Sequence, residues 1–439
     1  MSLLDAHVEA ANSWTRVGKC YEVTKKPRGV DIKSAALIPF ATMDAIPQGG
    51  AYDPVYTMRE PKNIASGTYF EQGDVLVAKI TPSFENGKQA LVRALPRSFG
   101  YASTEIIPLR PRHGGHDPRL LFFYLLHPDV RSYVAERMEG STGRQRVPEN
   151  VLLDLPIPDI ELRQQVVIAD SLEVIQAAIA AEDSAEANSK KLKQATMHEL
   201  FARGLRGEAQ KETDIGPMPQ SWNPKSILEL CDIWSGGTPR KSVAEYWSGE
   251  IPWVSGKDLK LPALDDVIDH ISVAGVDAGS RIAPKGAVLL LVRGMGLAKD
   301  LPVAVIKRPM AFNQDVKALV TRGQYSGEFL RSAIYAGKDR LLSQIVPSAH
   351  GTMTLNLNDV ESFKIACPSD NDEAAEIVTM LDVLDQKIAL HQQKKSVLNE
   401  LFRSLLHKLM TGEISFEDLD LSALTDAEPQ PQTEAEVKR

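Results

Sequence analysis

The chain has 439 residues, of which 43% are hydrophobic and 25% are charged. That length exceeds what one ordinary core supports, so we expect two or three domains, and the composition excludes disordered and fibrous proteins. The formal net charge of −8 argues against a nucleic-acid partner only if it is evenly spread. Residues 413–439 carry eight acidic and two basic side chains, so this tail contributes −6 and the other residues −2. A near-neutral body can present a basic face, so DNA is not excluded.

Membrane, secretory and disulfide-rich classes are not expected. The chain has no apolar run of about 18 residues, and its start, MSLLDAHVEAANSW, lacks the basic and apolar regions of a signal peptide. Cys20, Cys231 and Cys367 are widely spaced, which gives neither a disulfide framework nor a CxxC metal motif. We therefore expect a cytoplasmic protein without a membrane partner.

The first part of the chain, residues 1–157, reads as one globular domain. It begins with a tryptophan in NSWTRVGKCYEV, followed by an Ile-Pro-aromatic step, IPFATMDAI, from Ile38. A glycine turn, an apolar strand and a basic loop follow in GDVLVAKITPSFENGKQALV, residues 73–92. The polar-acidic step STEIIPL, a short amphipathic helix and the Gly-Ser/Thr loop EGSTGRQRVPENVLLDLPIP complete the pattern.

Residues 158–208 are predicted to form a long helix from about Glu161 to Arg203. A helix of about 40 residues spans roughly 60 Å. Its apolar positions recur at spacings of three and four, which predicts a coiled-coil seam through Ile168, Leu172, Ile175 and Ile179.

The patterns of the first part return in the same order in residues 209–368, so the chain contains an internal repeat. A tryptophan stands in QSWNPKSILELCDI, the Ile-Pro-aromatic step is IPWVSGKDL from Ile251, and the strand and basic loop are GAVLLLVRGMGLAKDLPVAVI, residues 286–306. NQDVKAL corresponds to STEIIPL, and SAHGTMTLNLNDVESFKIACP corresponds to the first Gly-Ser/Thr loop.

A second long helix is predicted in residues 369–412, with a stop at Thr411-Gly412 and an acidic, disordered tail over 413–439. Its heptad seam is interrupted by His391 and Lys395, and it runs through Ile377, Leu381, Leu384, Ile388, Leu398, Phe402, Leu405 and Leu409. Ordinary buried helices of one domain are the alternative. The expected fold class is α/β (α+β): two mixed α/β domains separated by two long antiparallel helices that form a coiled coil, with a pseudo-two-fold internal repeat.

The sequence motifs that could indicate enzyme chemistry are incomplete or wrongly spaced, so no catalytic, cofactor or metal site is predicted. The stretch WSGGTPRKSVAEYWSGEIPWVSGKDL places six residues between Gly249 and Gly256, whereas a P-loop needs four, and Asp258 follows the lysine where Ser or Thr should hold Mg²⁺. Gly294-x-Gly296 lacks the third glycine of a dinucleotide fold. His113 and His116 have a metal-compatible spacing but no supporting ligands, which indicates a solvated loop.

Three features occur together in this sequence: GGTP, YW, IPWV and DL in residues 234–259, a Gly-Ser/Thr loop before an IPIP step, and a long helix with a Leu-x-Gly-like stop. In this combination the chain resembles the specificity subunit of type I restriction-modification systems. The resemblance covers nearly the whole chain except the acidic tail, although the first half lacks the GGTP and YW elements. It implies a non-catalytic subunit with two target-recognition domains that read an asymmetric bipartite site in double-stranded DNA. It also implies helices that dock two methyltransferase subunits, with restriction subunits joining the complex. S-adenosylmethionine, ATP and Mg²⁺ would belong to those partners.

The DNA contacts are expected in the loops that interrupt paired strands and in the Gly-Ser/Thr loop, where cations would hold phosphates and an amide would reach a base edge. The candidates are Lys79, Asn86, Lys88, Arg144, Arg146, Arg240, Lys241, Lys257, Arg293 and Lys299. A solvated surface charge is the alternative at each position. Trp234, Trp247 and Trp253 are expected mainly as packing residues. Two other functions stay open: a stand-alone DNA-modifying enzyme, and a repeat scaffold that binds only proteins.

Overall fold

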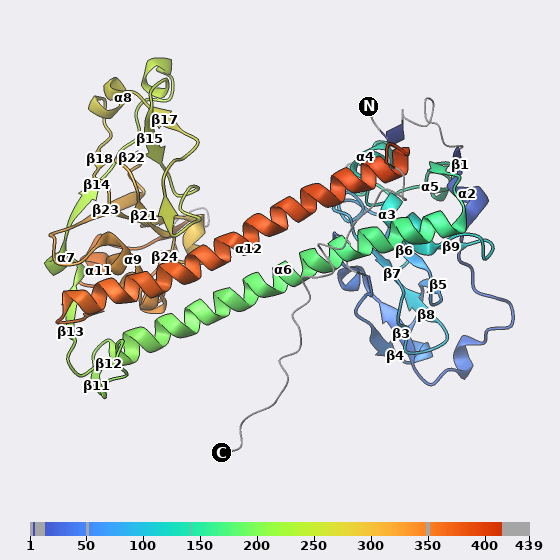
Figure 1. Cartoon of the computed structure of the whole chain (residues 1–439), viewed down its shortest axis with the longest axis horizontal. Coiled ribbons are helices and arrows are strands. Elements are labelled where there is room, and N and C mark those ends of the chain that lie inside the picture. Colours follow the sequence, from blue (N-terminus) through green and yellow to red (C-terminus); the bar gives the residue numbers. More distant parts are fainter. Residues whose placement is uncertain (1–2, 5–13, 50–51, 142, 348–351, 415–439) are drawn as a thin grey trace. The chain divides into compact units, whose positions relative to one another are not determined.

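The computed structural model describes residues 3–4, 14–49, 52–141, 143–347 and 352–414. The chain divides into two compact units, one formed by residues 1–185 and 391–439 and the other by residues 186–390 (Figure 1). Each unit contains one globular half and a segment of each of two long helices. The expected disorder of the acidic tail concerns residues that lie, from 415 onward, outside the described part.

Within its described residues, the first unit contains ten short strands. They are β1 (Trp14–Arg16), β2 (Tyr21–Val23), β3 (Ile38–Ala41), β4 (Thr57–Arg59), β5 (Thr68–Phe70), β6 (Val75–Ala78), β7 (Gln89–Leu91), β8 (Gly100–Ala102), β9 (Ile106–Pro111) and β10 (Pro156–Pro158). One sheet has the order β4-β3-β8-β5, with β3 parallel to β8, and the other has the antiparallel order β2-β9-β6-β7. β1 pairs with β10.

The apolar run in β6 is buried on both faces because successive side chains of a strand point to opposite sides. Val75 and Val77 belong to the core beneath the helices, whereas Leu76 belongs to a second core between the two sheets. The helices of this half are α2 (Val17–Cys20), α3 (Pro118–Tyr124), α4 (Pro128–Ala135) and α5 (Glu149–Leu153).

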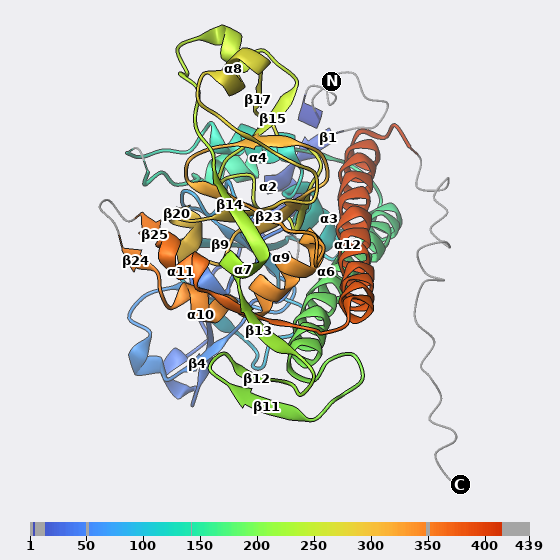
Figure 2. The ribbon, with the colours of Figure 1, turned by 90° about the vertical axis from the view of Figure 1, so that its left-hand side faces the viewer.

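The second unit repeats this architecture with longer connections. Its strands are β11 (Gln210–Thr213), β12 (Gly216–Pro219), β13 (Asn223–Ser226), β14 (Cys231–Ser235), β15 (Ile251–Val254), β16 (Ala263–Leu264), β17 (His270–Ile271), β18 (Ile282–Ala283), β19 (Val288–Leu291), β20 (Arg293–Gly294), β21 (Val303–Ile306), β22 (Met310–Phe312), β23 (Val316–Thr321), β24 (Val346–Pro347), β25 (Met353–Thr354) and β26 (Lys364–Cys367). Its short helices are α7 (Ile227–Leu230), α8 (Val273–Asp277), α9 (Gly327–Ala336), α10 (Lys338–Leu342) and α11 (Leu357–Glu361). In Figure 2, α9 lies beside the long helices, and the ring of Phe329 on α9 is 5.8 Å from that of Phe201.

Strand order shows the duplication directly. The sheet β17-β15-β22-β18 repeats β4-β3-β8-β5, including the one parallel pair in each, β15 with β22 and β3 with β8. The order β14-β23-β19-β21-β16 repeats β2-β9-β6-β7 with one added edge strand, and β13-β26 repeats β1-β10. The two Ile-Pro-aromatic steps, at Ile38 and Ile251, occupy equivalent strands, so the repeat expected from the sequence is present in the fold.

Two long helices, α6 (Leu162–Arg203) and α12 (Asn371–Thr411), run antiparallel. In the first unit, the early part of α6 at Leu172 shares a core with the late part of α12 at Leu405. In the second unit, the late part of α6 at Phe201 shares a core with the early part of α12 at Ile377. The expected class, mixed α/β halves with two antiparallel helices, is confirmed.

The seam residues divide by burial along the pair. Buried positions are Ile168, Leu172, Ile175, Ile377, Leu381, Leu405 and Leu409, and half-buried positions are Ile179, Leu384, Ile388, Leu398 and Phe402. Near the middle, polar pairs replace apolar ones: His391 Nδ1 lies 2.6 Å from Glu182, Lys395 2.8 Å from Asp183, and Lys193 2.5 Å from Asp385. Among the described residues, no helix is long and apolar enough to cross a membrane.

Candidate nucleic-acid interface

The Gly-Gly-Thr-Pro segment is a packing element between β14 and β15. A Cβ atom at Gly236 would lie 2.1 Å from the Phe312 carbonyl oxygen, and one at Gly237 would lie 1.8 Å from that of Gly279. The indole of Trp253 donates a hydrogen bond to the Gly237 carbonyl (3.0 Å). The glycines are therefore needed for close backbone approach, which explains their presence without a phosphate ligand.

The tryptophans of this segment pack. Trp253 is buried and contacts Trp247, with ring centroids 5.0 Å apart. Trp234 is half-buried beneath the guanidinium of Arg281, 3.8 Å from its ring. After the glycine turn, the side chains of Arg240 and Lys241 are exposed and have no side-chain partner among the described residues.

Lys257 occupies a tight turn at the end of β15. Asp258 accepts hydrogen bonds from the amide and hydroxyl of Ser255, both at 2.9 Å, which fixes the turn. The ammonium of Lys257 is exposed and lies 2.6 Å from Asp269. This ion pair raises the pKa of Lys257, chiefly through its hydrogen bond to Asp269. The lysine of this turn is therefore held by an ion pair with a carboxylate at the protein surface.

The second basic loop, residues 292–302, joins β19 to β21. It contains β20 and a 3-10 turn, Met295–Ala298. Arg293 pairs in register with Thr354 of β25, so the loop lies against the end of the second Gly-Ser/Thr region. The side chains of Arg293 and Lys299 are exposed, and neither has a side-chain partner within the described ranges.

The first basic loop, residues 79–88, joins β6 to β7 at the equivalent place in the first half. Asn86 is exposed, and Lys79 is half-buried. Lys88 donates to the Met43 carbonyl (3.0 Å) and lies 3.9 Å from Asp44. This lysine is therefore partly engaged within the protein, whereas Asn86 is free to reach outward.

The Gly-Ser/Thr loop of the first half lies against the 79–88 loop. Arg146 bridges to Ile80 and forms a two-point ion pair with Glu105, at 2.9 and 2.7 Å. The hydrogen bond from Arg146 lowers the pKa of Glu105. Arg144 is exposed. The structure thus brings together the two loops of the first half that carry Lys79 and Arg146.

The same juxtaposition occurs in the second half. The amide of Val292 donates to the backbone carbonyl of Asp315 as that of Lys79 donates to the backbone carbonyl of Glu105, both at 2.9 Å. Sequence reasoning did not single out the polar neighbours Lys317 and Gln314. Lys317 donates to Ser235 (2.8 Å), and Gln314 accepts from Thr238 (2.6 Å). The sequence feature that could have identified these two residues is the NQDVKAL segment that contains them, because it contacts the GGTP segment.

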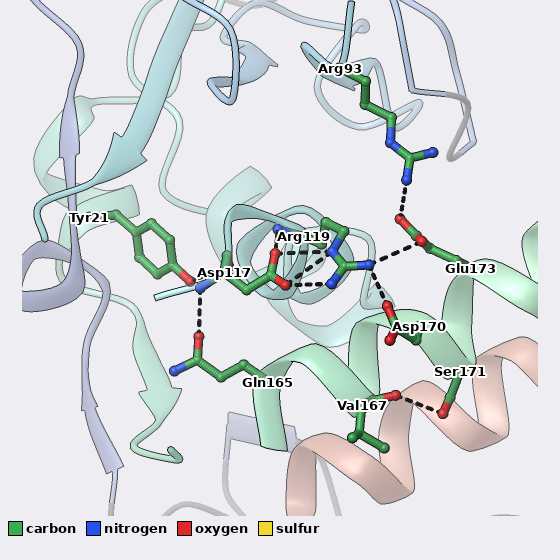
Figure 3. Close-up of polar contacts among 9 residues, drawn as sticks. All are labelled: Tyr21, Arg93, Asp117, Arg119, Gln165, Val167, Asp170, Ser171 and Glu173. Atoms are coloured by element: carbon green, nitrogen blue, oxygen red, sulfur yellow. Dashed lines mark hydrogen bonds and ion pairs between the residues drawn. The ribbon is translucent and has the colours of Figure 1, made fainter. Parts of the chain in front are cut away.

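A second group missed by sequence reasoning fixes the first globular half on α6 (Figure 3). Arg119 on α3 contacts Asp170 at 2.6 Å and Glu173 at 3.1 Å, both on α6, and Asp117 at 2.7 Å. The pKa of Arg119 is raised above its usual value, chiefly because its guanidinium donates hydrogen bonds to Asp117. Arg93, which follows β7, adds a 2.8 Å contact to Glu173. This cluster orients the sheet that carries the 79–88 loop relative to the helix.

His127, Asp129 and His407 form a compact group that could be taken for a metal site. The Asp129 amide donates to His127 Nδ1 (3.1 Å), which places the ring proton on Nε2, facing His407 Nδ1 at 3.1 Å. Burial lowers the pKa of His127 to about 4, so the ring is neutral near pH 7. The Nδ1 lone pair of His127, which a metal would need, already accepts the hydrogen bond from the Asp129 amide. The group instead connects α4 to the end of α12.

Fold and loops define a tandem protein, with two copies of one α/β module carried on a pair of antiparallel helices. Residues 219–400 match the model of the type I restriction modification DNA specificity domain. The chain is 30% identical over 210 residues to the type I restriction enzyme MjaIX specificity subunit of Methanocaldococcus jannaschii, covering 46% of this chain and 47% of that protein. It is 23% identical to the HindI specificity subunit of Haemophilus influenzae over 78% of this chain and 87% of that protein.

Solved structures agree at the level of the fold. A chain from a study of complex assembly and conformational transition of the type I R-M system superposes with a TM-score of 0.57 at 19% identity, covering 92% of this chain and 98% of that one. The type I restriction-modification S subunit from M. genitalium gives 0.54 at 15% identity, covering 91% and 96%. The chain is thus similar to type I restriction specificity subunits, through the family model over residues 219–400 and through these two relatives. Its match spans about half the length of the MjaIX protein.

Proposed function

We propose that this chain is the non-catalytic DNA-reading subunit of a type I restriction-modification complex, and that its recognition domains, residues 1–157 and 209–368, each read one half of an asymmetric bipartite site. One observation carries the proposal: the halves share one strand order, but their corresponding loops present different side chains. The 79–88 loop offers Lys79, Asn86 and Lys88, whereas the 292–302 loop offers Arg293 and Lys299. Equivalent scaffolds with different reading loops suit half-sites of different sequence.

The charges of the loops favour a phosphate backbone as ligand. Arg240, Lys241, Arg293 and Lys299 are exposed and make no internal ion pair among the described residues, so each is free to replace counterions on DNA. Lys257 is exposed and pairs at the surface with the half-buried carboxylate of Asp269. Such surface pairs contribute only about 0–1 kcal/mol, so a phosphate can displace the carboxylate.

An exposed apolar row on α12 supports the docking of partner subunits. Met380, Val383, Leu390, Val397 and Leu401 recur at spacings built from three and four, and all are exposed. This row lies on a different face from the seam, and a row of this length on a soluble helix marks a protein-binding surface. We assign it to helices of two methyltransferase subunits, with restriction subunits joining the assembly. S-adenosylmethionine, ATP and Mg²⁺ are assigned to those partners, and the complex to the cytoplasm.

The test uses the full chain, alone and assembled with its modification subunits, in gel-shift titrations with random-sequence duplex DNA at several salt concentrations. The proposal predicts binding by the assembled complex that weakens steeply with salt. Methyl transfer to DNA by the purified chain alone would instead identify a stand-alone enzyme. An assembled complex with no affinity for any duplex would identify a scaffold that binds only proteins.

A further inference from the structure

The 79–88 loop is held from inside by one arginine of a neighbouring helix. Arg131 on α4 donates to the Phe84 carbonyl (2.5 Å), to the Leu125 carbonyl (2.7 Å) and to the side chain of Gln89 (3.2 Å). Gln89 is itself buried, at 1% exposure, where the loop enters β7. The guanidinium fork therefore joins the middle of the loop to its end and to the helix layer.

The chemistry of this anchor requires a guanidinium. Three acceptors in different directions match a planar fork, whereas a lysine ammonium is a compact charge on a flexible stem. Burial lowers the pKa of Arg131 to about 10, so the group remains charged near pH 7. Gly87 has φ +79°, a backbone conformation that favours glycine, and lies beside the guanidinium in the same loop.

The 292–302 loop is held at the equivalent place by different chemistry. Asp300 accepts hydrogen bonds from the hydroxyl of Tyr335 on α9 (2.8 Å) and from the ammonium of Lys338 on α10 (2.7 Å). It also accepts from the Leu301 amide (2.8 Å), and Lys338 donates to the Tyr335 hydroxyl (3.0 Å). Partial burial acts to raise the pKa of Asp300, but these donors outweigh it and lower the pKa.

Each anchor adds side-chain hydrogen bonds to a loop whose backbone also contacts neighbouring segments, for example Gly49 with Gly87 and Arg293 with Thr354. Each loop joins two antiparallel strands and carries the candidate DNA contacts near its exposed part. An irregular loop loses conformational entropy when it is ordered, so a loop that must present side chains to base edges benefits from being ordered before DNA arrives. A helix-borne anchor on each reading loop provides this order, and neither anchor is itself one of the candidate DNA contacts.

We propose that Arg131 and Asp300 are positioning residues for DNA recognition, and that each fixes the reading loop of its own half and hence the sequence preference at one half of the target. This inference rests on the proposed function. Neither residue needs to touch DNA, and loss of either anchor should relax the reading of one half-site while the other half-site is read normally.

Substitutions that remove or keep a charge distinguish a positioning role of these residues from a purely electrostatic effect on DNA binding. Asp300→Asn removes a negative charge near DNA, so electrostatics alone predicts tighter binding. Loss of positioning predicts the opposite for cognate DNA, because Asn cannot hold Lys338 as an ion-pair partner. Arg131→Lys leaves the charge unchanged, so any effect on DNA reading must come from lost geometry.

The experiment selects from a pool of random-sequence duplexes with the full chain assembled with its modification subunits, and compares the recovered consensus for each variant. Asp265→Asn and Arg97→Lys serve as controls, because both side chains are exposed and make no side-chain contact among the described residues. Tyr335→Phe removes one hydroxyl from the Asp300 anchor and provides a milder second variant. Thermal unfolding of every variant reports folding separately.

We expect Arg131→Lys to degrade one half of the consensus and Asp300→Asn the other, with the controls unchanged. A misplaced base contact forfeits about 1 kcal/mol or more of discrimination, so the preference for cognate over single-mismatch duplex in the affected half should fall by about fivefold or more. An unchanged consensus in folded variants, or equal loss in both halves, would overturn the inference. Failure of the wild-type complex to yield any consensus would instead refute the proposed function.

Discussion

Asp74 is a buried carboxyl whose replacement should stabilise the protein in a pH-dependent way. Its side chain follows the turn into β6, it is 2% exposed, and it accepts a hydrogen bond from the Glu71 amide at 2.8 Å. Burial, the largest influence, raises its pKa from 3.8 to about 7. The equivalent position in the second half is Ala287, also buried, so the fold itself does not require a carboxylate there.

The sign of the pH effect follows from this shift. The folded state holds the proton more tightly than the unfolded state, so the protonated form contributes fully below pH 3.8, and stability falls as pH rises towards 7. Since each pKa unit corresponds to about 1.4 kcal/mol, Asp74 should cost about 2 kcal/mol at about pH 5, where folding requires its protonation, and about 4 kcal/mol at about pH 8, where it is ionised in the folded state. Asp74→Asn keeps an acceptor for the Glu71 amide and removes that cost.

Urea unfolding of the full chain at about pH 5 and about pH 8 measures this difference. The Asn variant should be more stable than wild type at both values, with the larger gain at the higher pH. Glu85→Gln is the control, because this exposed side chain forms no hydrogen bond or ion pair among the described residues and its neutralisation should change stability little at either pH. A gain that does not grow with pH, or a loss of stability at about pH 8, would refute the reasoning.

Three further changes test other parts of the structure. Arg119→Met should cost about 3 kcal/mol in urea unfolding, because it leaves the buried Asp117 and its neighbour Asp170 without their cation and leaves Glu173 with Arg93 alone, and an unchanged stability would show that the cluster is not structural. Gly236→Ala should lower stability by about 1–3 kcal/mol, whereas Gly114→Ala, which meets nothing within 4 Å, should not, and equal melting temperatures would contradict the packing role. Arg293→Gln should leave unfolding unchanged but reduce the slope of log affinity against log salt by about 0.9, and an unaltered slope would remove Arg293 from the phosphate contacts.

Much of the architecture could be predicted because its signals are local or periodic. The Ile-Pro-aromatic steps at Ile38 and Ile251 mark equivalent strands, and the heptad positions of α12 identify its seam directly from spacing. The antiparallel direction of the helices followed from the order of the repeat. These features depend on nearest neighbours along the chain or on a fixed period, so sequence alone carries them.

The polar clusters could not be predicted, because their members are brought together only by the fold. Arg119 meets Asp170 and Glu173 across about 50 residues of chain, and Arg146 meets Glu105 across about 40 residues that include β9, α3 and α4. The need for Gly236 likewise comes from the Phe312 backbone, which lies far along the sequence. The candidate DNA contacts stay a prediction, since exposure and loop position do not identify which side chains touch bases.

The most direct test of the account is a map of methylated adenines in a host that carries this gene together with its methyltransferase partner. Two readers of one topology with different loops predict a single asymmetric motif in two parts, separated by a gap of fixed length. A palindromic motif, or a genome without new methylation, would contradict the account.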